Sequence, residues 1–261
     1  MIINKMLTEL YQEKSGKVSL KWELYLKEYD RVLREYQDSP VNILEIGVQN
    51  GGSLEVWSQY FRNAKLIVGV DIDDKCQSLV YSDSRIQVII GDCCQQDVLE
   101  KITGQAATFD LVFDDGSHQS ADIIKAFLLY FPNLSVDGLY IIEDLHCSYW
   151  ENYQGGLFDP YSSIAFIKKL IDIINHQHWQ NELSINLFFE NFLVQLGLDP
   201  LMINVDFLNQ VHSIEIINSL CIIKKKVIKE NIIRGLAVRG SDDSIVSEDA
   251  KQVIDYIKGL K

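Results

Sequence analysis

The chain has 261 residues, of which 47% are hydrophobic, and its formal net charge is −13 at pH 7. The length suits one large α/β domain or a core domain with additions, and the apolar share is sufficient for a full core. Because a strongly acidic protein repels phosphate backbones and anionic lipid surfaces, the charge argues against nucleic acid as a partner.

The composition also bears on location. The sequence contains no stretch of about 20 apolar residues, so we expect no membrane span. Its first residues lack the long apolar region of a signal peptide. The five cysteines are odd in number and include no C-x-x-C pair, which favours reduced thiols in a cytoplasmic protein. A homo-oligomer remains open at this stage.

Two helices, over residues 3–13 and 20–36, are expected before the first strand. Strands and helices then alternate, which is typical of a parallel sheet with crossover helices. The strands are expected at 42–47, 65–71, 86–91, 109–113 and 139–143. Helices are expected near 53–62, 95–103 and 120–131, with a shorter one after residue 71.

The second half of the chain is expected to close the sheet. A long helix is expected near 161–178, and residues 180–210 are apolar but poorly periodic, with some helix. Residues 212–217 and 220–224 flank Asn218-Ser219, which predicts an antiparallel hairpin with a two-residue turn. We therefore divide the chain into a helical cap at 1–40, a core domain at 41–225 and a tail at 226–261, with a last helix over 247–258.

The first strand is followed by a turn that suits a nucleotide-like ligand. Gly47 ends the strand and Gly51 opens the next helix, so backbone N–H groups can approach a ligand. Asp71 ends the second strand, where a carboxylate can accept hydrogen bonds from ribose hydroxyls. Gln49 replaces the second glycine of the dinucleotide fingerprint and disfavours pyrophosphate.

Two further acids are more typical of S-adenosylmethionine sites. Glu45 precedes the first glycine by two residues, and Asp92 follows the third strand, where it can hold the adenine amino group. A simpler interpretation is a tight strand-to-helix turn that needs glycine. Asp71 and Asp92 together make that interpretation weaker.

Three carboxylates follow strands four and five. Asp115 comes after one strand, and Glu143 and Asp144 come after its expected neighbour. Converging carboxylates would repel one another, and a hard divalent cation such as Mg²⁺ would remove that cost. The simpler alternative is that one or two of them cap the following helices.

His118 lies three residues beyond Asp115, in the loop over this predicted metal site. Imidazole titrates near neutrality, as a general base must. We therefore expect His118 to be catalytic, although a lone histidine is often a plain surface or core residue. His146 is a second candidate base, and contact with the substrate is its favoured role.

Three motifs resemble one known family. They are Val41 to Gly52, Asp114-Asp115-Gly116-Ser117-His118, and Glu143-Asp144-Leu145-His146-Cys147-Ser148-Tyr149-Trp150. Together they are similar to the macrocin and mycinamicin sugar O-methyltransferases, which are metal-dependent class I S-adenosylmethionine enzymes. The similarity covers about residues 17–225 and extends to Lys17-Val18-Ser19-Leu20-Lys21-Trp22, although related members often have Asp where Leu20 stands.

The resemblance implies a Rossmann-like class I methyltransferase fold and assigns the site residues. Asp115, Glu143 and Asp144 would be Mg²⁺ ligands, and His118 the general base. Asp71 would hold the cofactor ribose, and Asp114 would face the methionine amino group. The entry to the acceptor pocket would be lined by Ser148, Tyr149 and Trp150.

We therefore expect a cytoplasmic, Mg²⁺-dependent O-methyltransferase that acts on a sugar hydroxyl of a bacterial glycan or a glycosylated natural product. Three alternatives stay open. They are an NAD(P)-binding oxidoreductase, an enzyme like the cephalosporin hydroxylases, and a non-catalytic S-adenosylmethionine-binding module. Gln49 and the lack of a Tyr-x-x-x-Lys motif argue against the first, and the intact acids with His118 argue against the last.

Overall fold

The computed structural model describes residues 5–201 and 204–259. It divides into a large compact unit that runs to Asn231 and a small unit that begins at Ile232. The large unit contains the sheet together with both N-terminal helices. The small unit contains one helix, α8 (Glu248–Gly259), close to the predicted range of 247–258.

One seven-stranded sheet organises the large unit, in the order β3-β2-β1-β4-β5-β7-β6. The first five strands are parallel, and the last two are antiparallel, as predicted. Their bounds are Asn42–Ile46 (β1), Leu66–Asp71 (β2), Ile86–Ile90 (β3), Phe109–Asp114 (β4), Leu134–Ile142 (β5), Val211–Ile217 (β6) and Leu220–Lys225 (β7). Asn218 and Ser219 form the predicted two-residue turn, with Ser219 at φ 68°.

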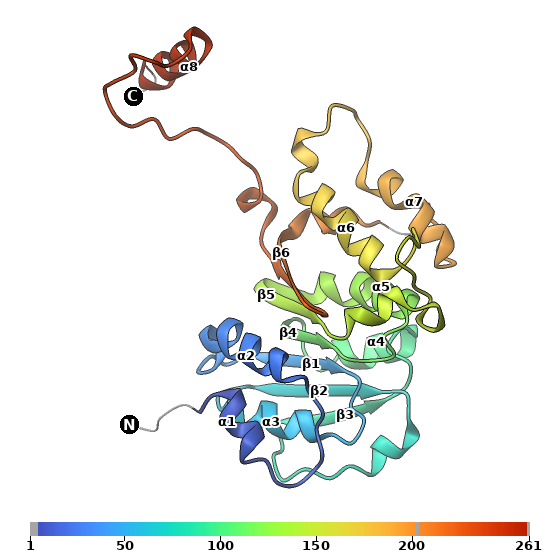
Figure 1. Cartoon of the computed structure of the whole chain (residues 1–261). Coiled ribbons are helices and arrows are strands. Elements are labelled where there is room, and N and C mark those ends of the chain that lie inside the picture. Colours follow the sequence, from blue (N-terminus) through green and yellow to red (C-terminus); the bar gives the residue numbers. More distant parts are fainter. Residues whose placement is uncertain (1–4, 202–203, 260–261) are drawn as a thin grey trace. The chain divides into compact units, whose positions relative to one another are not determined.

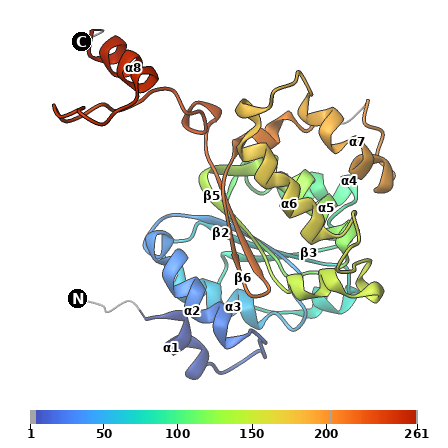
Figure 2. The same cartoon turned by 45° about the horizontal axis from the view of Figure 1, so that its top comes forward.

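Helices cover both faces of this sheet (Figures 1 and 2). One face carries α1 (Leu7–Gln12), α2 (Glu23–Val32) and α3 (Gly52–Tyr60), and the other carries α4 (Gln96–Thr103), α5 (Ser120–Tyr130), α6 (Ser163–Ile174) and α7 (Ile185–Gln195). Short 3₁₀ helices connect them, at Arg34–Tyr36, Asp74–Ser78, Phe131–Asn133, Leu145–Tyr149, Glu151–Tyr153, His176–His178, Asp206–Gln210 and Ile228–Glu230.

Each face of the sheet has its own apolar core. Under α1–α3, the rings of Trp57 and Phe113 stack with centroids 4.5 Å apart. Under α4–α7, Phe127 packs edge-on against Tyr140, with centroids 5.0 Å apart. Because the central strands are buried on both faces, they read in the sequence as continuous apolar runs.

Several predicted boundaries are wrong. Helix α2 covers only part of the predicted range 20–36, because a separate 3₁₀ turn follows it at 34–36. β5 begins at Leu134, five residues before the predicted start, because Gly138 lies inside a strand irregularity and does not break the strand. The register shifts between Phe109 and Leu111, and Asp137 adopts φ 69°. Helix α6 is shorter than expected, because the side chain of Ser162 caps its start and a 3₁₀ turn replaces its end at 176–178.

Among residues 5–201 and 204–259, no helix has the length and apolarity that a membrane crossing requires. All five cysteines are free thiols.

Candidate active site at the carboxyl edge of the sheet

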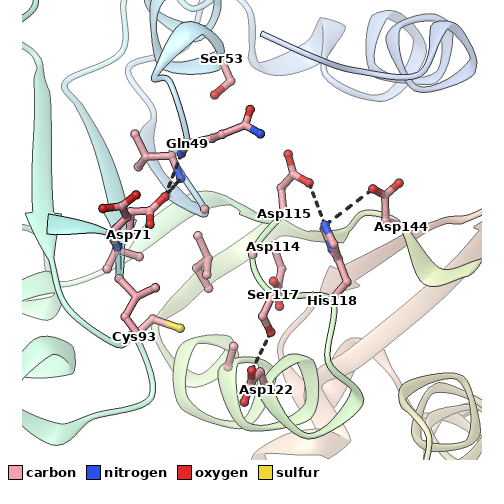
Figure 3. Close-up of a pocket in the computed structure, with 18 of the residues that line it drawn as sticks. Gln49, Ser53, Asp71, Cys93, Asp114, Asp115, Ser117, His118, Asp122 and Asp144 are labelled. Atoms are coloured by element: carbon pink, nitrogen blue, oxygen red, sulfur yellow. Dashed lines mark hydrogen bonds and ion pairs between the residues drawn. The ribbon is translucent and has the colours of Figure 1, made fainter. Parts of the chain in front are cut away.

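A cavity of about 600 Å³ opens at the carboxyl ends of the parallel strands. It lies where the strand order reverses, since β1 pairs with β2 on one side and with β4 on the other. Parallel sheets bind ligands at this point, and the volume suits a cofactor. Its lining includes Gly47, Gln49, Asp71, Asp92, Asp114, Asp115, His118 and Asp144, several of which are shown in Figure 3.

On the predicted cofactor side of the cavity, hydrogen bonds tie the loop after β1 to the end of β2. The carboxylate of Asp71 accepts the backbone N–H groups of Val48 and Gln49 through one oxygen, both at 2.8 Å, and that of Asp73 through the other at 2.9 Å. Burial alone would raise the pKa of Asp71, but these N–H groups outweigh burial and the pKa is lowered. Asp71 is therefore an ionised carboxylate fixed by main chain.

Gly47 holds the two halves of the site together. Its φ is +93°, and a Cβ at this position would lie 2.1 Å from the carbonyl oxygen of Asp115. Any side chain would separate the cofactor loop from the loop that carries the acids. Gly51 has a different place, outside the cavity lining, where its carbonyl oxygen accepts the Tyr81 hydroxyl at 3.3 Å.

The other predicted cofactor residues occupy different depths. Asp92 lines the cavity and accepts the backbone N–H of Cys94 at 2.9 Å. Asp114 also lines the cavity, and burial raises its pKa to about 7. Glu45 lies behind the lining and is fully buried, with the Ser53 hydroxyl donating to it at 2.8 Å. Burial raises the pKa of Glu45 to about 7.

On the opposite side of the cavity, Asp115, His118 and Asp144 meet. The His118 Nε2 atom lies 3.9 Å from Asp115 Oδ1 and 3.7 Å from Asp144 Oδ2. One ligand atom from each residue falls within 4.8 Å of the others, which is the spacing of a cation site. Figure 3 shows the imidazole between the two carboxylates, across the cavity from Asp71. His118 has φ 58°, so the strained loop presents its ring to the acids.

Glu143 does not join that group, because its carboxylate is turned into the protein. Its Oε1 atom accepts the Lys21 ammonium and the Tyr29 hydroxyl, both at 2.6 Å. Burial raises the pKa of Glu143 to about 8, although Lys21 opposes the shift. The three predicted metal ligands are thus divided, with Asp115 and Asp144 at the cavity and Glu143 beneath them.

Lys21 was not among the predicted site residues. Its side chain is only 1% exposed, and its ammonium group pairs with Asp115 and Glu143 and lies 3.9 Å from Glu45. Burial would lower the pKa of Lys21, but the carboxylates outweigh burial and the pKa is raised well above its usual value. The family resemblance of Lys17 to Trp22 contains Lys21, although the position that differs from related members is Leu20, which is 71% exposed.

The predicted acceptor residues share the 3₁₀ segment after Asp144 and its end, but only some face outward. Tyr149 and Trp150 are about half exposed, whereas Ser148 is buried against the Ser163 hydroxyl at 2.5 Å. The His146 ring packs edge-on against Trp150, with centroids 4.9 Å apart. Trp22 extends this aromatic group from the N-terminal segment, 6.2 Å from His146.

The tip of the β6–β7 hairpin supports the same segment. The Ser219 hydroxyl contacts Nδ1 of His146 at 2.5 Å, and the Ser219 carbonyl oxygen accepts the backbone N–H of Leu145 at 2.9 Å. That carbonyl oxygen also accepts the Tyr25 hydroxyl, which donates to Asp144 as well, both at 2.9 Å. The hairpin turn is therefore part of the site's framework.

Residues 44–145 match the model of a family described as a methyltransferase domain. The chain is 35% identical over 186 residues to demethylmacrocin O-methyltransferase from Streptomyces fradiae, covering 67% of this chain and 45% of that protein. It is 39% identical over 160 residues to mycinamicin VI 2''-O-methyltransferase from Micromonospora griseorubida, covering 57% and 39%. The chain thus spans less than half the length of these curated relatives.

Among solved structures, the MycE methyltransferase of the mycinamycin biosynthetic pathway, in complex with Mg and SAH, superposes with a TM-score of 0.70. That comparison has 26% sequence identity and covers 98% of this chain and 61% of the other. The similarity therefore includes the sheet, the helices on both faces and the closing hairpin.

Proposed function

We propose that this chain, a relative of the macrocin- and mycinamicin-type sugar O-methyltransferases, transfers a methyl group from S-adenosylmethionine to a sugar hydroxyl. The observation that carries the proposal is one cavity with two chemically different sides. Asp71 marks a nucleoside-binding side, and Asp115, His118 and Asp144 mark a side that can bind a cation and remove a proton. Methyl transfer to oxygen needs both sides close together.

The cofactor side fits S-adenosylmethionine. Asp71 would accept the ribose hydroxyls, and Asp92 would hold the adenine amino group at the neighbouring strand end. Asp114, buried in the same lining, would face the methionine amino group. Gly47 would let the methionine amino group approach the main chain. Glu45 and Gly51, which lie outside the cavity lining, would support the turn.

The donor set on the other side fits a hard divalent cation. Asp115 and Asp144 each direct one oxygen to the same spot beside His118, and oxygen-rich sites of this kind suit Mg²⁺. Glu143 lies outside this donor set, because Lys21 and Tyr29 hold its carboxylate. When bound, such a cation would orient the acceptor oxygens and lower the pKa of the hydroxyl.

His118 is the proposed general base. Its Nε2 atom lies between Asp115 Oδ1 and Asp144 Oδ2. Because these oxygens would hold the cation, an acceptor hydroxyl bound to that cation would lie near Nε2. The proton of the hydroxyl would pass to Nε2 as the oxygen forms its bond to the methyl carbon and the carbon–sulfur bond breaks. The sulfur keeps that electron pair, so the cofactor product is the neutral thioether.

The acceptor is proposed to be a sugar, on a bacterial glycan or a glycosylated natural product. Apolar faces of pyranose rings suit aromatic surfaces, and the half-exposed Tyr149 and Trp150 follow Asp144 in the chain. The Trp150 ring packs against His146, whose Nδ1 lies 3.9 Å from Asp144 Oδ1. The name of one relative includes a sugar, since the 8-demethyl-8-alpha-L-rhamnosyl tetracenomycin-C 2'-O-methyltransferase from Streptomyces olivaceus is 36% identical to this chain over 169 residues.

The test is an acceptor screen with the full chain, S-adenosylmethionine and Mg²⁺. Sugar nucleotides and glycosides are offered, and mass spectrometry detects the gain of one methyl group. Calorimetry with S-adenosylmethionine and with NAD runs in parallel. Binding of NAD in preference to S-adenosylmethionine would reject the proposal in favour of an oxidoreductase.

A further inference from the structure

Lys21 places a full positive charge inside the acidic cluster. Its ammonium group donates to Asp115 Oδ2 and Glu143 Oε1, with Glu45 Oε1 at 3.9 Å. A lysine side chain that is 1% exposed loses nearly all of its hydration, and the paired carboxylates compensate for that loss. The protein therefore carries its own cation at a place where acids would otherwise repel one another.

The ammonium group and the proposed divalent ion use different oxygens of a shared ligand. Asp115 gives Oδ2 to Lys21 and directs Oδ1 toward His118. Asp144 behaves in the same way, since Trp22 and Tyr25 donate to its Oδ1 while Oδ2 faces His118. Lys21 and the ion would thus lie on opposite sides of the Asp115 carboxylate and repel each other across it.

We propose that Lys21 is a resident cation that competes electrostatically with the divalent ion, so that the protein holds the ion weakly. This inference rests on the metal site of the proposed function. Lys21 keeps the carboxylates together when no ion is bound, and its charge raises the free energy of the ion-bound state. The ion then exchanges readily with solution, and acceptor oxygens supply part of its binding.

The charges decide the direction of the effect. Removing the ammonium group removes repulsion that acts on a dication twice as strongly as on a single charge. Without Lys21, one of the carboxylates could bind a proton. That proton carries a single charge, so it would cancel only part of the increase in affinity for the divalent ion. Loss of Lys21 must therefore tighten binding of the divalent ion.

The experiment compares Lys21→Met with the wild-type chain. Free Mn²⁺ is measured by electron paramagnetic resonance during titration of the full chain, with no methyl donor or acceptor present. We expect the Mn²⁺ dissociation constant to fall by about tenfold or more. An unchanged or larger dissociation constant would overturn the inference.

The matched control is Lys225→Met. Lys225 is also buried, but its ammonium group donates to the carbonyl oxygens of Phe131, Pro132 and Leu134, at the other end of β5. Removing it costs stability without removing charge from the acids. We expect the Mn²⁺ affinity of Lys225→Met to match the wild type, and a change as large as that of Lys21→Met would count against the inference.

Lys21→Gln keeps the test decisive if Lys21→Met does not fold. The amide can still donate hydrogen bonds to the carboxylates, so a role in orientation alone predicts wild-type affinity. The proposed charge effect predicts tighter binding. If neither the wild type nor the variants bind Mn²⁺, the proposed metal site is wrong together with this inference. If methylation needs the metal but the Lys21 variants bind Mn²⁺ no more tightly than the wild type, only this inference is wrong.

Discussion

Two acids on opposite sides of the cavity, Asp71 and Glu143, are held in opposite ways. On the cofactor side, backbone N–H groups surround Asp71 and its pKa is lowered. On the acceptor side, burial raises the pKa of Glu143 to about 8 even though Lys21 and Tyr29 contact it. The negative charge of Asp71 is therefore stabilised by the main chain, whereas that of Glu143 depends on the neighbouring Lys21.

The difference has a physical reason. Backbone dipoles are fixed when the loop folds, so the cofactor side is preorganised before any ligand arrives. Carboxylates that are buried close together repel one another, and this repulsion can be compensated by a lysine, a proton or a metal ion. We therefore expect the loop held by Asp71 to respond weakly to salt, pH and metal, and the carboxylates around Lys21 to respond strongly.

The largest expected effect comes from removing the carboxylate of Asp115, the proposed cation ligand. Asp115→Asn should lower kcat by at least about 10³-fold, because Lewis-acid stabilisation is worth several kcal/mol. Excess chelator should do the same to the wild type, and added Mg²⁺ should restore it. Calorimetry should find S-adenosylmethionine binding nearly unchanged, and full turnover in chelator would show that no metal is needed.

The next effect concerns the base. His118→Ala should lower kcat by about 10²–10⁴-fold, the usual contribution of general base catalysis. Binding of S-adenosylmethionine and Mn²⁺ should remain. His146→Ala is the matched variant, because His146 contacts Asp144 from the other side, at 3.9 Å. If His146→Ala loses turnover and His118→Ala does not, the base has been assigned to the wrong histidine.

A smaller effect should appear in stability against pH. The pKa of Glu45 is raised from 4.5 to about 7 when folded, so the folded state binds more protons than the unfolded state between these values. Stability should therefore fall as pH rises from about 4.5 to about 7, by about 3 kcal/mol at most from this group. Urea unfolding of metal-free protein should show a flatter pH dependence in Glu45→Gln, and identical slopes would contradict the buried assignment.

The smallest effect is expected on the cofactor side. Asp71→Asn keeps an acceptor for the loop N–H groups but loses the charge, so S-adenosylmethionine affinity should fall by about tenfold with little change in unfolding temperature. Calorimetry measures the first quantity and thermal unfolding the second. An affinity equal to that of the wild type would remove Asp71 from the cofactor site.

Much of this architecture can be predicted from sequence because strand periodicity and turn residues are local signals. The five parallel strands and the hairpin at Asn218-Ser219 are confirmed by the structure. The start of β5 was missed because Gly138 resembles a strand breaker, whereas here it lies beside the register shift between β4 and β5. That shift depends on pairing with a strand some 25 residues away in the chain.

The acids at the strand ends could also be predicted, but their division could not. Glu143 and Asp144 are neighbours in sequence, yet the left-handed conformation of Asp144, with φ 53°, sends their carboxylates to different places. Lys21 was missed because lysine is almost never fully buried without a partner. Its partners follow strands four and five, about a hundred residues later in the chain, so no local pattern marks it.

In the described part of the chain, the hairpin turn between β6 and β7 contacts the proposed acceptor residues but not the proposed cofactor loops. Ser219 contacts His146 and Leu145 in the segment after Asp144, whereas the loops around Asp71 and Asp92 come from the opposite half of the sheet, beyond β1. A change of turn length or of the residue at 219 would reshape the floor under the aromatic group while β1–β3 keep their geometry. If the proposed function holds, substitutions at this turn alter the segment around His146 and leave the loops of Asp71 and Asp92 unchanged.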